Sequence, residues 1–122
     1  RLITSQRLIR RLCKCHRVRE ADQQTVDFFG SKGVQFSDGR RLIGHPEGCP
    51  DCNYSGYKGR ICVLESLVVD HEIRDLIADS EKTSAIRSVA LQRGYIPLFS
   101  QGLHKVIAGH TSLAEVRHHI EE

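Results

Sequence analysis

The pattern of apolar and polar positions divides the chain into a β-rich first half and a helical second half. Apolar residues at positions 2, 3, 8, 9 and 12 suit either a strand or a helix end, and we favour a strand left over from a preceding domain. Two further β-rich runs, 40–44 and 60–67, predict two more strands. A short helix is expected over 22–30, with Asp22 as its N-cap and Gly30 as its left-handed end.

Four short amphipathic helices are predicted after residue 68. The first is capped by Asp70, the second opens at Thr83 or Ser84 and ends at Gly94, and the third runs from about residue 100 to 109. The last begins at a capping box, 112–115, in which each side chain bonds the other's backbone amide. We expect the four helices to share one core, because each has a single apolar face. The inward positions would be Ile73, Leu76, Ile77, Ile86, Val89, Ala90, Leu103, Val106 and Ile107.

Two cysteine-bearing segments hold the clearest chemistry of the chain. Cys49 and Cys52 lie three positions apart in a turn rich in glycine and proline, where both thiolates can face one tetrahedral metal. The second half of such a site has one source, the segment around Cys13. We favour His16 as the partner of Cys13, since that pair repeats the three-residue spacing. Cys15 stays open as the alternative fourth ligand, and loss of the metal is a smaller alternative. The pattern predicts a structural zinc ion that closes the intervening loop.

Other interpretations of the same cysteines fit less well. A redox pair needs a helix N-terminus to lower its thiol pKa, and a turn follows Cys52 instead. Chaperone zinc modules repeat the Cys-x-x-Cys unit several times, and this chain has it once. Cys62 lies in an apolar, β-rich run and is expected to be a buried thiol. The four histidines of the helical half are expected on the surface: His104, His110, His118 and His119.

Composition limits the classes of protein. The 122 residues are 39% hydrophobic and 27% charged, which is typical of a soluble globular chain of one compact or two small domains. No apolar run approaches the roughly 20 residues of a membrane span and no signal peptide opens the chain, so we expect no insertion into a membrane. Five cysteines without an export signal favour metal ligation in a reducing cytosol. A start at Arg1 rather than Met indicates a fragment of a longer protein.

Charge is distributed unevenly. Residues 1–19 hold seven basic groups and no acid, and the remaining residues hold 11 basic and 15 acidic groups and carry −4. A basic head of this kind suits a nucleic acid, an acidic lipid surface, a phosphate ligand or simply a solvated face. No aromatic residue interleaves it, so it offers no stacking platform for single strands and we expect no nucleic acid partner. A free-standing zinc module that binds nucleic acid or protein through this head remains the alternative.

Several motifs resemble one known family. Residues 6–16 resemble the end of the motor domain in secretion and pilus assembly ATPases of the GspE/PilB type, with His16 at the position of that family's second cysteine. Residues 48–60 match the family's Gly-Cys-x-x-Cys-x-x-Thr-Gly-Tyr-x-Gly-Arg, with serine for threonine. Residues 102–116 match its Gly-Leu-x-Lys-Val-x-x-Gly-x-Thr-Ser-Leu-Glu-Glu-Val pattern. Cys62 replaces a glycine of the family and Gln101 an aspartate.

The resemblance implies an α+β chain in three parts. Residues 1–12 would be the tail of an upstream RecA-like motor domain, 13–66 a zinc-binding, tetracysteine-like subdomain with a few short strands and a helix, and 67–122 a C-terminal bundle of about four short helices. The parent would be a hexameric cytoplasmic ATPase that uses ATP and magnesium and drives a platform protein of the bacterial inner membrane.

Its nucleotide motifs would lie upstream of this chain, which itself shows no phosphate loop, no paired catalytic carboxylates and no Ser-His-Asp set. No catalytic residue is therefore expected here. Arg7 is the one nucleotide-proximal candidate that the resemblance suggests. Metal ligands are expected at Cys13, His16, Cys49 and Cys52, with zinc as the cofactor.

Overall fold

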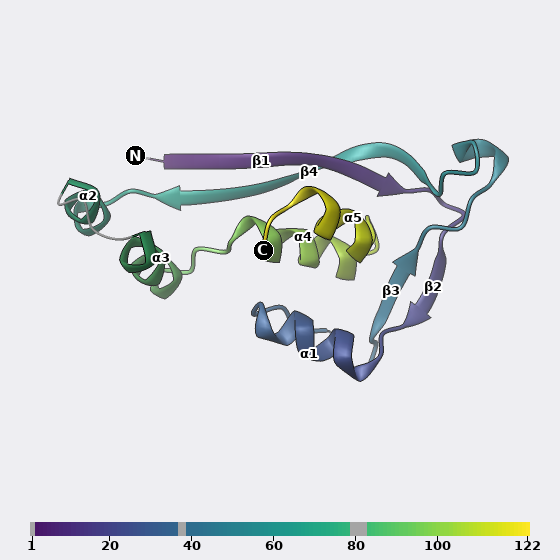
Figure 1. Cartoon of the computed structure of the whole chain (residues 1–122), viewed down its shortest axis with the longest axis horizontal. Helices are drawn as coiled ribbons and strands as arrows, with labels where there is room; N and C mark the ends of the chain where they lie inside the picture. Colours follow the sequence, from purple (N-terminus) through teal and green to yellow (C-terminus); the bar gives the residue numbers. More distant parts are fainter. Residues whose placement is uncertain (1, 37–38, 79–82) are drawn as a thin grey trace.

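The computed structural model describes residues 2–36, 39–78 and 83–122, and this part of the chain is α+β (Figure 1). Its strands are β1 (Leu2–Leu12), β2 (Arg17–Glu20), β3 (Leu42–His45) and β4 (Tyr57–Val68). Its helices are α1 (Gln23–Ser31), α2 (His71–Ala78), α3 (Thr83–Gln92), α4 (Leu98–Ile107) and α5 (Leu113–His119), with a short 3-10 turn, η1 (Pro50–Cys52). None of the helices in the described ranges is long and apolar enough to cross a membrane.

A long antiparallel ribbon of β1 and β4 is the backbone of the fold. Leu2 lies opposite Val68 and Arg10 opposite Arg60, and the register shifts just before the end of β1. Figure 1 shows α4 and α5 beneath one face of this ribbon and α1 below them. The strands expected at 40–44 and 60–67 are present as β3 and β4.

The second sheet pairs β2 with β3 antiparallel, at the end of the ribbon where β1 leaves it (Figure 1). β2 was not expected from the sequence. All four of its residues are exposed and only one is aliphatic, so it carries no alternating pattern. Its pairing with β3 comes from backbone hydrogen bonds, which a hydrophobic pattern does not reveal.

The main core lies between the ribbon and three helices, α1, α4 and α5. Side chains alternate along a strand, and on the face turned to these helices Ile9 of β1 and Val63 of β4 are buried. Close packing is required where α4 meets α5, since a Cβ on Gly102 would come 2.9 Å from Cγ1 of Val116. The buried apolar residues of this core are Ile9, Ala21, Phe29, Val34, Ile43, Val63, Phe99, Leu103, Val106, Val116 and Ile120.

Helices α2 and α3 form a separate, smaller core, which corrects the expectation of one four-helix bundle. The buried residues of this core are Ile73 of α2, Ala90 of α3 and Val69, which lies just before α2, and they are far along the ribbon from α4 and α5. The physical reason is the length of β4, which carries the chain to Val68 before α2 begins. Ile77, expected inward, is 49% exposed. The inward position expected for Leu76 lies outside the described side chains.

The predicted helix starts are confirmed better than the predicted ends. Asp22 and Asp70 each accept a hydrogen bond from the backbone N–H three residues on, as an N-cap does. Gly94, with φ 83°, follows α3 as expected. Gly30 was wrong as the end of α1, because the helix continues to residue 31 and the left-handed residue is Gly33, with φ 76°.

Candidate metal centre

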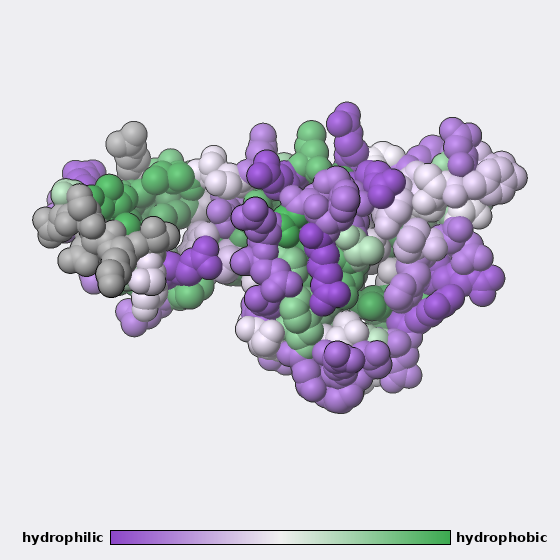
Figure 2. Space-filling model, viewed as in Figure 1, coloured by the Kyte–Doolittle hydropathy of each residue, from purple (hydrophilic) through white to green (hydrophobic). Residues whose placement is uncertain are grey.

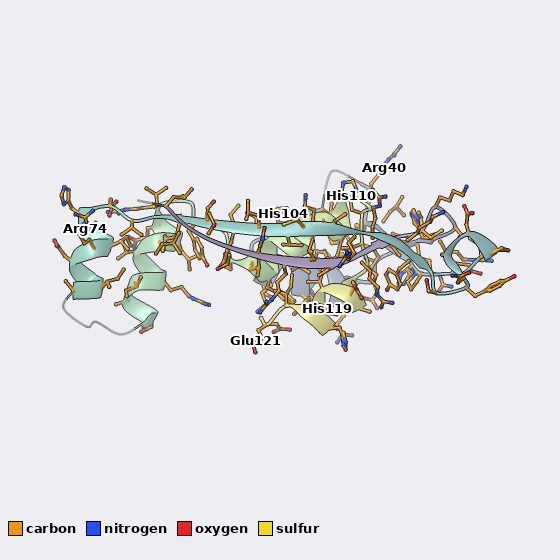
Figure 3. All side chains as sticks on the ribbon, turned by 90° about the horizontal axis from the view of Figure 1, so that it is seen from above. Arg40, Arg74, His104, His110, His119 and Glu121 are labelled. Carbon is orange, nitrogen blue, oxygen red and sulfur yellow. The ribbon has the colours of Figure 1, made fainter. Side chains whose placement is uncertain are left out.

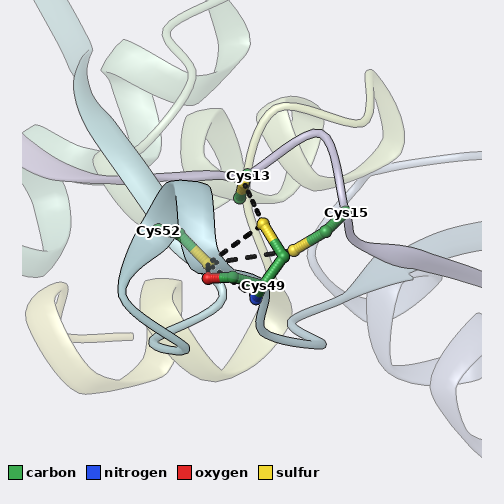
Figure 4. A group of neighbouring side chains, drawn as sticks. All are labelled: Cys13, Cys15, Cys49 and Cys52. Atoms are coloured by element: carbon green, nitrogen blue, oxygen red, sulfur yellow. Dashed lines mark hydrogen bonds between the residues drawn. The ribbon is translucent and has the colours of Figure 1, made fainter.

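Four cysteines from two distant segments meet where the ribbon joins the second sheet (Figure 4). Cys13 and Cys15 follow the end of β1, while Cys49 and Cys52 flank and end the η1 turn. All four sulfur atoms lie within 4.8 Å of one another. The Sγ–Sγ distance is 3.7 Å for Cys13–Cys49, 3.9 Å for Cys15–Cys52 and 3.8 Å for Cys49–Cys52.

These distances match the edges of a zinc tetrahedron. Four sulfurs at the usual Zn–S bond length of about 2.3 Å are separated from one another by about 3.8 Å. Three edges of the cysteine group have that length to within a tenth of an ångström. A tetrahedral set of four thiolates selects zinc or iron among biological metals. The residues therefore fit a tetrahedral metal ion, and the four sulfurs include that of Cys15, the alternative ligand.

The turn around the second pair orients its sulfurs with backbone N–H groups. The amides of Cys49 and Gly56 each donate to the Cys52 sulfur at 3.2 Å. Gly56 has φ 86°, and a Cβ there would lie 2.5 Å from the Cβ of Pro46, so only glycine fits. Burial raises the pKa of the Cys52 thiol, but the two amides and the neighbouring thiols outweigh it and bring the pKa to about 6. The turn is thus built to hold a thiolate.

The sulfur of Cys15 behaves differently. An N–H of Gly48 favours its thiolate, but burial and the three neighbouring thiols raise its pKa to about 12. Four thiolates this close to one another repel, and a divalent cation among them removes that repulsion. The electrostatics of the group therefore agree with its geometry.

His16 stands beside the four sulfurs but not among them. Its Nδ1 lies 2.8 Å from the carbonyl oxygen of Cys13, and its backbone N–H donates to the same oxygen at 3.0 Å. Its ring packs on Gly44, where a Cβ would come 3.0 Å from Cδ2. The tight turn over 13–16 brings the sulfur of Cys15 toward Cys52 instead.

Cys62 lies outside the group, and the expectation that it is buried was wrong. It is exposed on the face of the ribbon that points away from the helices, with its Sγ 3.4 Å from Oε1 of Gln6. Strand alternation explains the difference, because Val63 takes the buried position next to it. The four histidines expected on the surface are all exposed, and Figure 3 labels three of them.

Arg7 lines an open cavity of about 560 Å³ between the ribbon and the C-terminal residues. The cavity brings it near Arg87 and Arg117, and near the pair in which the hydroxyl of Tyr95 donates to Glu65 at 2.7 Å. Basic and acidic groups are mixed there. The proximity of Arg7 to a nucleotide stays a prediction.

The basic head is partly neutralised by acids far away in sequence. Lys14 pairs with Asp51 at 3.0 Å and Arg17 with Glu47 at 2.9 Å. Arg10 pairs with a buried carboxylate of α5 at 3.0 Å. Arg1 lies outside the described residues. Exposed pairs contribute little stability, but they reduce the charge that the head presents to a polyanion.

Glu115 is the residue that motif analysis missed. The expected capping box forms by half, since the Ser112 hydroxyl accepts from the Glu115 amide at 3.1 Å. The carboxylate of Glu115 turns to Arg10 instead and is buried. No local spacing signals this contact, because its partners are 105 residues apart.

Fold and site together describe a small module that holds a four-cysteine group at one end of a β-ribbon, and comparison with known proteins supplies its family. A family model described as Type II/IV secretion system protein matches residues 1–118. The chain belongs to this family, as its motifs predicted.

Curated relatives agree with the family assignment. The chain is 36% identical over 115 residues to the Type IV pilus assembly ATPase PilB of Thermus thermophilus and 36% identical to a putative type II secretion system protein E of Escherichia coli. It is 35% identical to the type II secretion system ATPase E of Vibrio cholerae. Each match covers 93% of this chain, but it spans only 13% of the Thermus protein and 22% of the other two.

Proposed function

We propose that this chain is the zinc-binding and helical C-terminal portion of a hexameric secretion or pilus assembly ATPase. Its role is structural: it forms a rigid bracket that contacts neighbouring subunits and an inner-membrane platform protein. The observation that carries the proposal is the group of four sulfurs at tetrahedral spacing in a chain of this family. Hydrolysis of ATP with magnesium belongs to the rest of the parent, on the cytoplasmic side of the bacterial inner membrane.

We assign the zinc ligands as Cys13, Cys15, Cys49 and Cys52, with His16 as a neighbour that braces the first turn. Zinc bound there supplies a cross-link between segments 36 residues apart. The chain's own residues prepare the site: the N–H groups of the second turn favour thiolates, and the 13–16 turn presents the other two sulfurs. Closing this loop fixes the second sheet against the end of the ribbon.

The outer face of the ribbon supports the idea of a larger parent. We define the outer face as eight exposed residues of the ribbon that point away from the helices, up to the row of charged residues that begins at Arg60: Leu2, Thr4, Gln6, Leu8, Cys62, Leu64, Ser66 and Val68. None of them is charged, and the four aliphatic ones are 51% to 66% exposed. Figure 3 shows the strands in front of the helices, with no other described element over them, and Figure 2 shows apolar side chains reaching the surface near α2. An uncharged sheet face suits burial against the remainder of a longer protein.

Substitution of the cysteines in the parent protein tests the proposal. Cys49→Ser with Cys52→Ser should remove zinc and stop secretion or pilus extension, while the matched control Cys62→Ser changes an exposed cysteine outside the group. Zinc content, ATP hydrolysis and transport are measured on the same preparations. Transport at the normal rate by a zinc-free parent would contradict the structural role. The isolated chain should bind zinc and show no ATP turnover.

A further inference from the structure

A short segment of the C-terminal part closes the open edge of β1 directly before the first cysteine pair. We call this segment, His110–Glu115, the strap. The amide of Leu12 donates to the carbonyl of His110 at 2.9 Å, and the hydroxyl of Thr111 donates to the carbonyl of Arg10 at 2.8 Å. Thr111 is fully buried. The strap therefore takes the place of a neighbouring strand at the last residues of β1.

Glu115 makes the strongest contact of the strap. Its carboxylate accepts the backbone N–H of Arg10 at 2.7 Å and two guanidinium N–H groups of the same residue at 3.0 and 3.2 Å. Burial raises the pKa of this carboxyl, but the bonds from Arg10 outweigh it and hold the pKa below its usual range. The Arg10 guanidinium also lies over the ring of Tyr57, 4.1 Å from its centroid.

The strap reaches both sides of the metal centre. On one side it fixes Leu12, the residue before Cys13. On the other, the Ser112 hydroxyl lies 2.7 Å from that of Tyr57. Tyr57 follows Gly56, whose carbonyl accepts the amide of Cys13 at 3.0 Å. The strap thus holds the two chain segments that carry the first and second half-sites.

We infer that Glu115 is a positioning residue of the metal centre, although it lies outside the ligand group. It holds the end of β1 at the place where Cys13 must meet Cys49, so its loss lowers metal affinity and not only stability. Residues that orient metal ligands from outside the ligand shell typically change affinity by about 10–100-fold. This inference rests on the proposed zinc site.

The experiment compares zinc affinities by competition with a chromophoric chelator. Glu115→Ala should weaken zinc binding by about 10–100-fold, and Glu115→Gln, which keeps acceptors for Arg10, should recover part of the loss. Thr111→Val removes one hydroxyl at nearly constant volume and should weaken binding less. The matched control is Glu121→Ala, an exposed carboxylate that lies beyond α5 and outside the strap (Figure 3).

Two further measurements separate positioning from general stability. In the cobalt-substituted protein, Glu115→Ala should alter the d–d absorption bands, which report the geometry of the ligands. Hydrogen exchange at the amides of Leu12 and Cys13 should quicken while exchange in α2 and α3 stays unchanged. If Glu115→Ala does not fold, the same readouts on Glu115→Gln and Thr111→Val decide.

The outcomes distinguish this inference from the proposed site. If the chain binds zinc and every strap variant that folds has the zinc affinity and cobalt spectrum of Glu121→Ala, this inference alone is overturned. Absence of zinc binding by the unaltered chain would overturn the site and, with it, the role of the strap.

Discussion

The carboxylate of Glu115 lies 2.7 Å from the backbone nitrogen of Arg10, across 105 residues of sequence. This contact joins the last helix to the strand that leads into the four-cysteine group. The carboxylate is buried, whereas the guanidinium of Arg10 is half exposed, so the pair is only partly removed from water.

Removal of this carboxylate should destabilise the zinc-loaded chain. We expect Glu115→Ala to cost about 2–3 kcal/mol at pH 7, since hydrogen bonds to a charged group contribute about 1.5–3 kcal/mol. Glu115→Gln should cost less, because it still accepts the Arg10 amide. Urea unfolding with an unchanged m value measures both. Stabilities of all three proteins within roughly 0.5 kcal/mol would mean that the contact is energetically neutral.

The same contact sets a pH dependence. The folded pKa of Glu115 lies below its ordinary value of 4.5, so its contribution is present above that pH and is lost as the pH falls through the folded value. The stability difference between the unaltered chain and Glu115→Gln, both stripped of metal, should therefore shrink below pH 4.5. Arg10 and His119 are the basic side chains that contact the carboxylate. A difference that grows on acidification would contradict this assignment.

The fourth ligand can be tested directly. Cys15→Ser should lose zinc affinity by orders of magnitude, whereas His16→Ala should retain it, because the Cys15 sulfur lies 3.9 Å from that of Cys52. In the cobalt-substituted protein, the intensity of the thiolate-to-metal charge-transfer absorption should fall by the share of one thiolate in Cys15→Ser and stay unchanged in His16→Ala. If His16→Ala loses zinc and Cys15→Ser retains it, the fourth ligand is His16 and not Cys15.

Two glycines with similar backbone conformations provide a matched pair. Gly56 and Gly94 have φ of 86° and 83°, but a Cβ would collide with Pro46 at the first and meet nothing within 4 Å at the second. Gly94→Ala should cost about 1–2 kcal/mol from backbone strain and leave zinc binding unchanged. Gly56→Ala should cost more and weaken zinc binding, since its amide bonds Cys52. Isothermal titration measures the zinc affinity of the two variants and thermal unfolding measures their stability. Equal losses of zinc affinity in both variants would mean that the turn at Gly56 does not orient the metal ligands.

The outer face should respond differently in the isolated chain and in the parent. Leu64 is 51% exposed in the chain alone, so Leu64→Lys should change its stability by less than about 0.5 kcal/mol. In the parent the same lysine would be buried without a partner and should lower the melting temperature by several degrees. An unchanged melting temperature in the parent would leave the outer face open to solvent there.

Local chemistry was readable from the sequence. Asp22 and Asp70 were identified as caps because a cap depends on residues three positions away. The two cysteine segments were identified because ligand spacing in a turn is also local. The apolar run at the end of β4 predicted a strand, but it did not reveal that α2 begins beyond the ribbon, away from the main core.

Contacts between residues far apart in the sequence could not be predicted from it. Spacing favoured His16, yet the turn over 13–16 turns Cys15 toward the other pair, and this depends on where the second segment lies in space. Glu115 had a local role available in the capping box, and a partner 105 residues away competes for its carboxylate. In both cases a contact with a segment distant in the sequence outweighs the interaction that local spacing predicts.

Metal analysis of the chain purified under reducing conditions tests the central claim most directly. Elemental analysis together with native mass spectrometry should find one zinc ion per chain in the unaltered protein and in Cys62→Ser, and none in the variant that combines Cys49→Ser with Cys52→Ser. A folded, reduced chain without metal, or one that holds iron in place of zinc, would contradict the account.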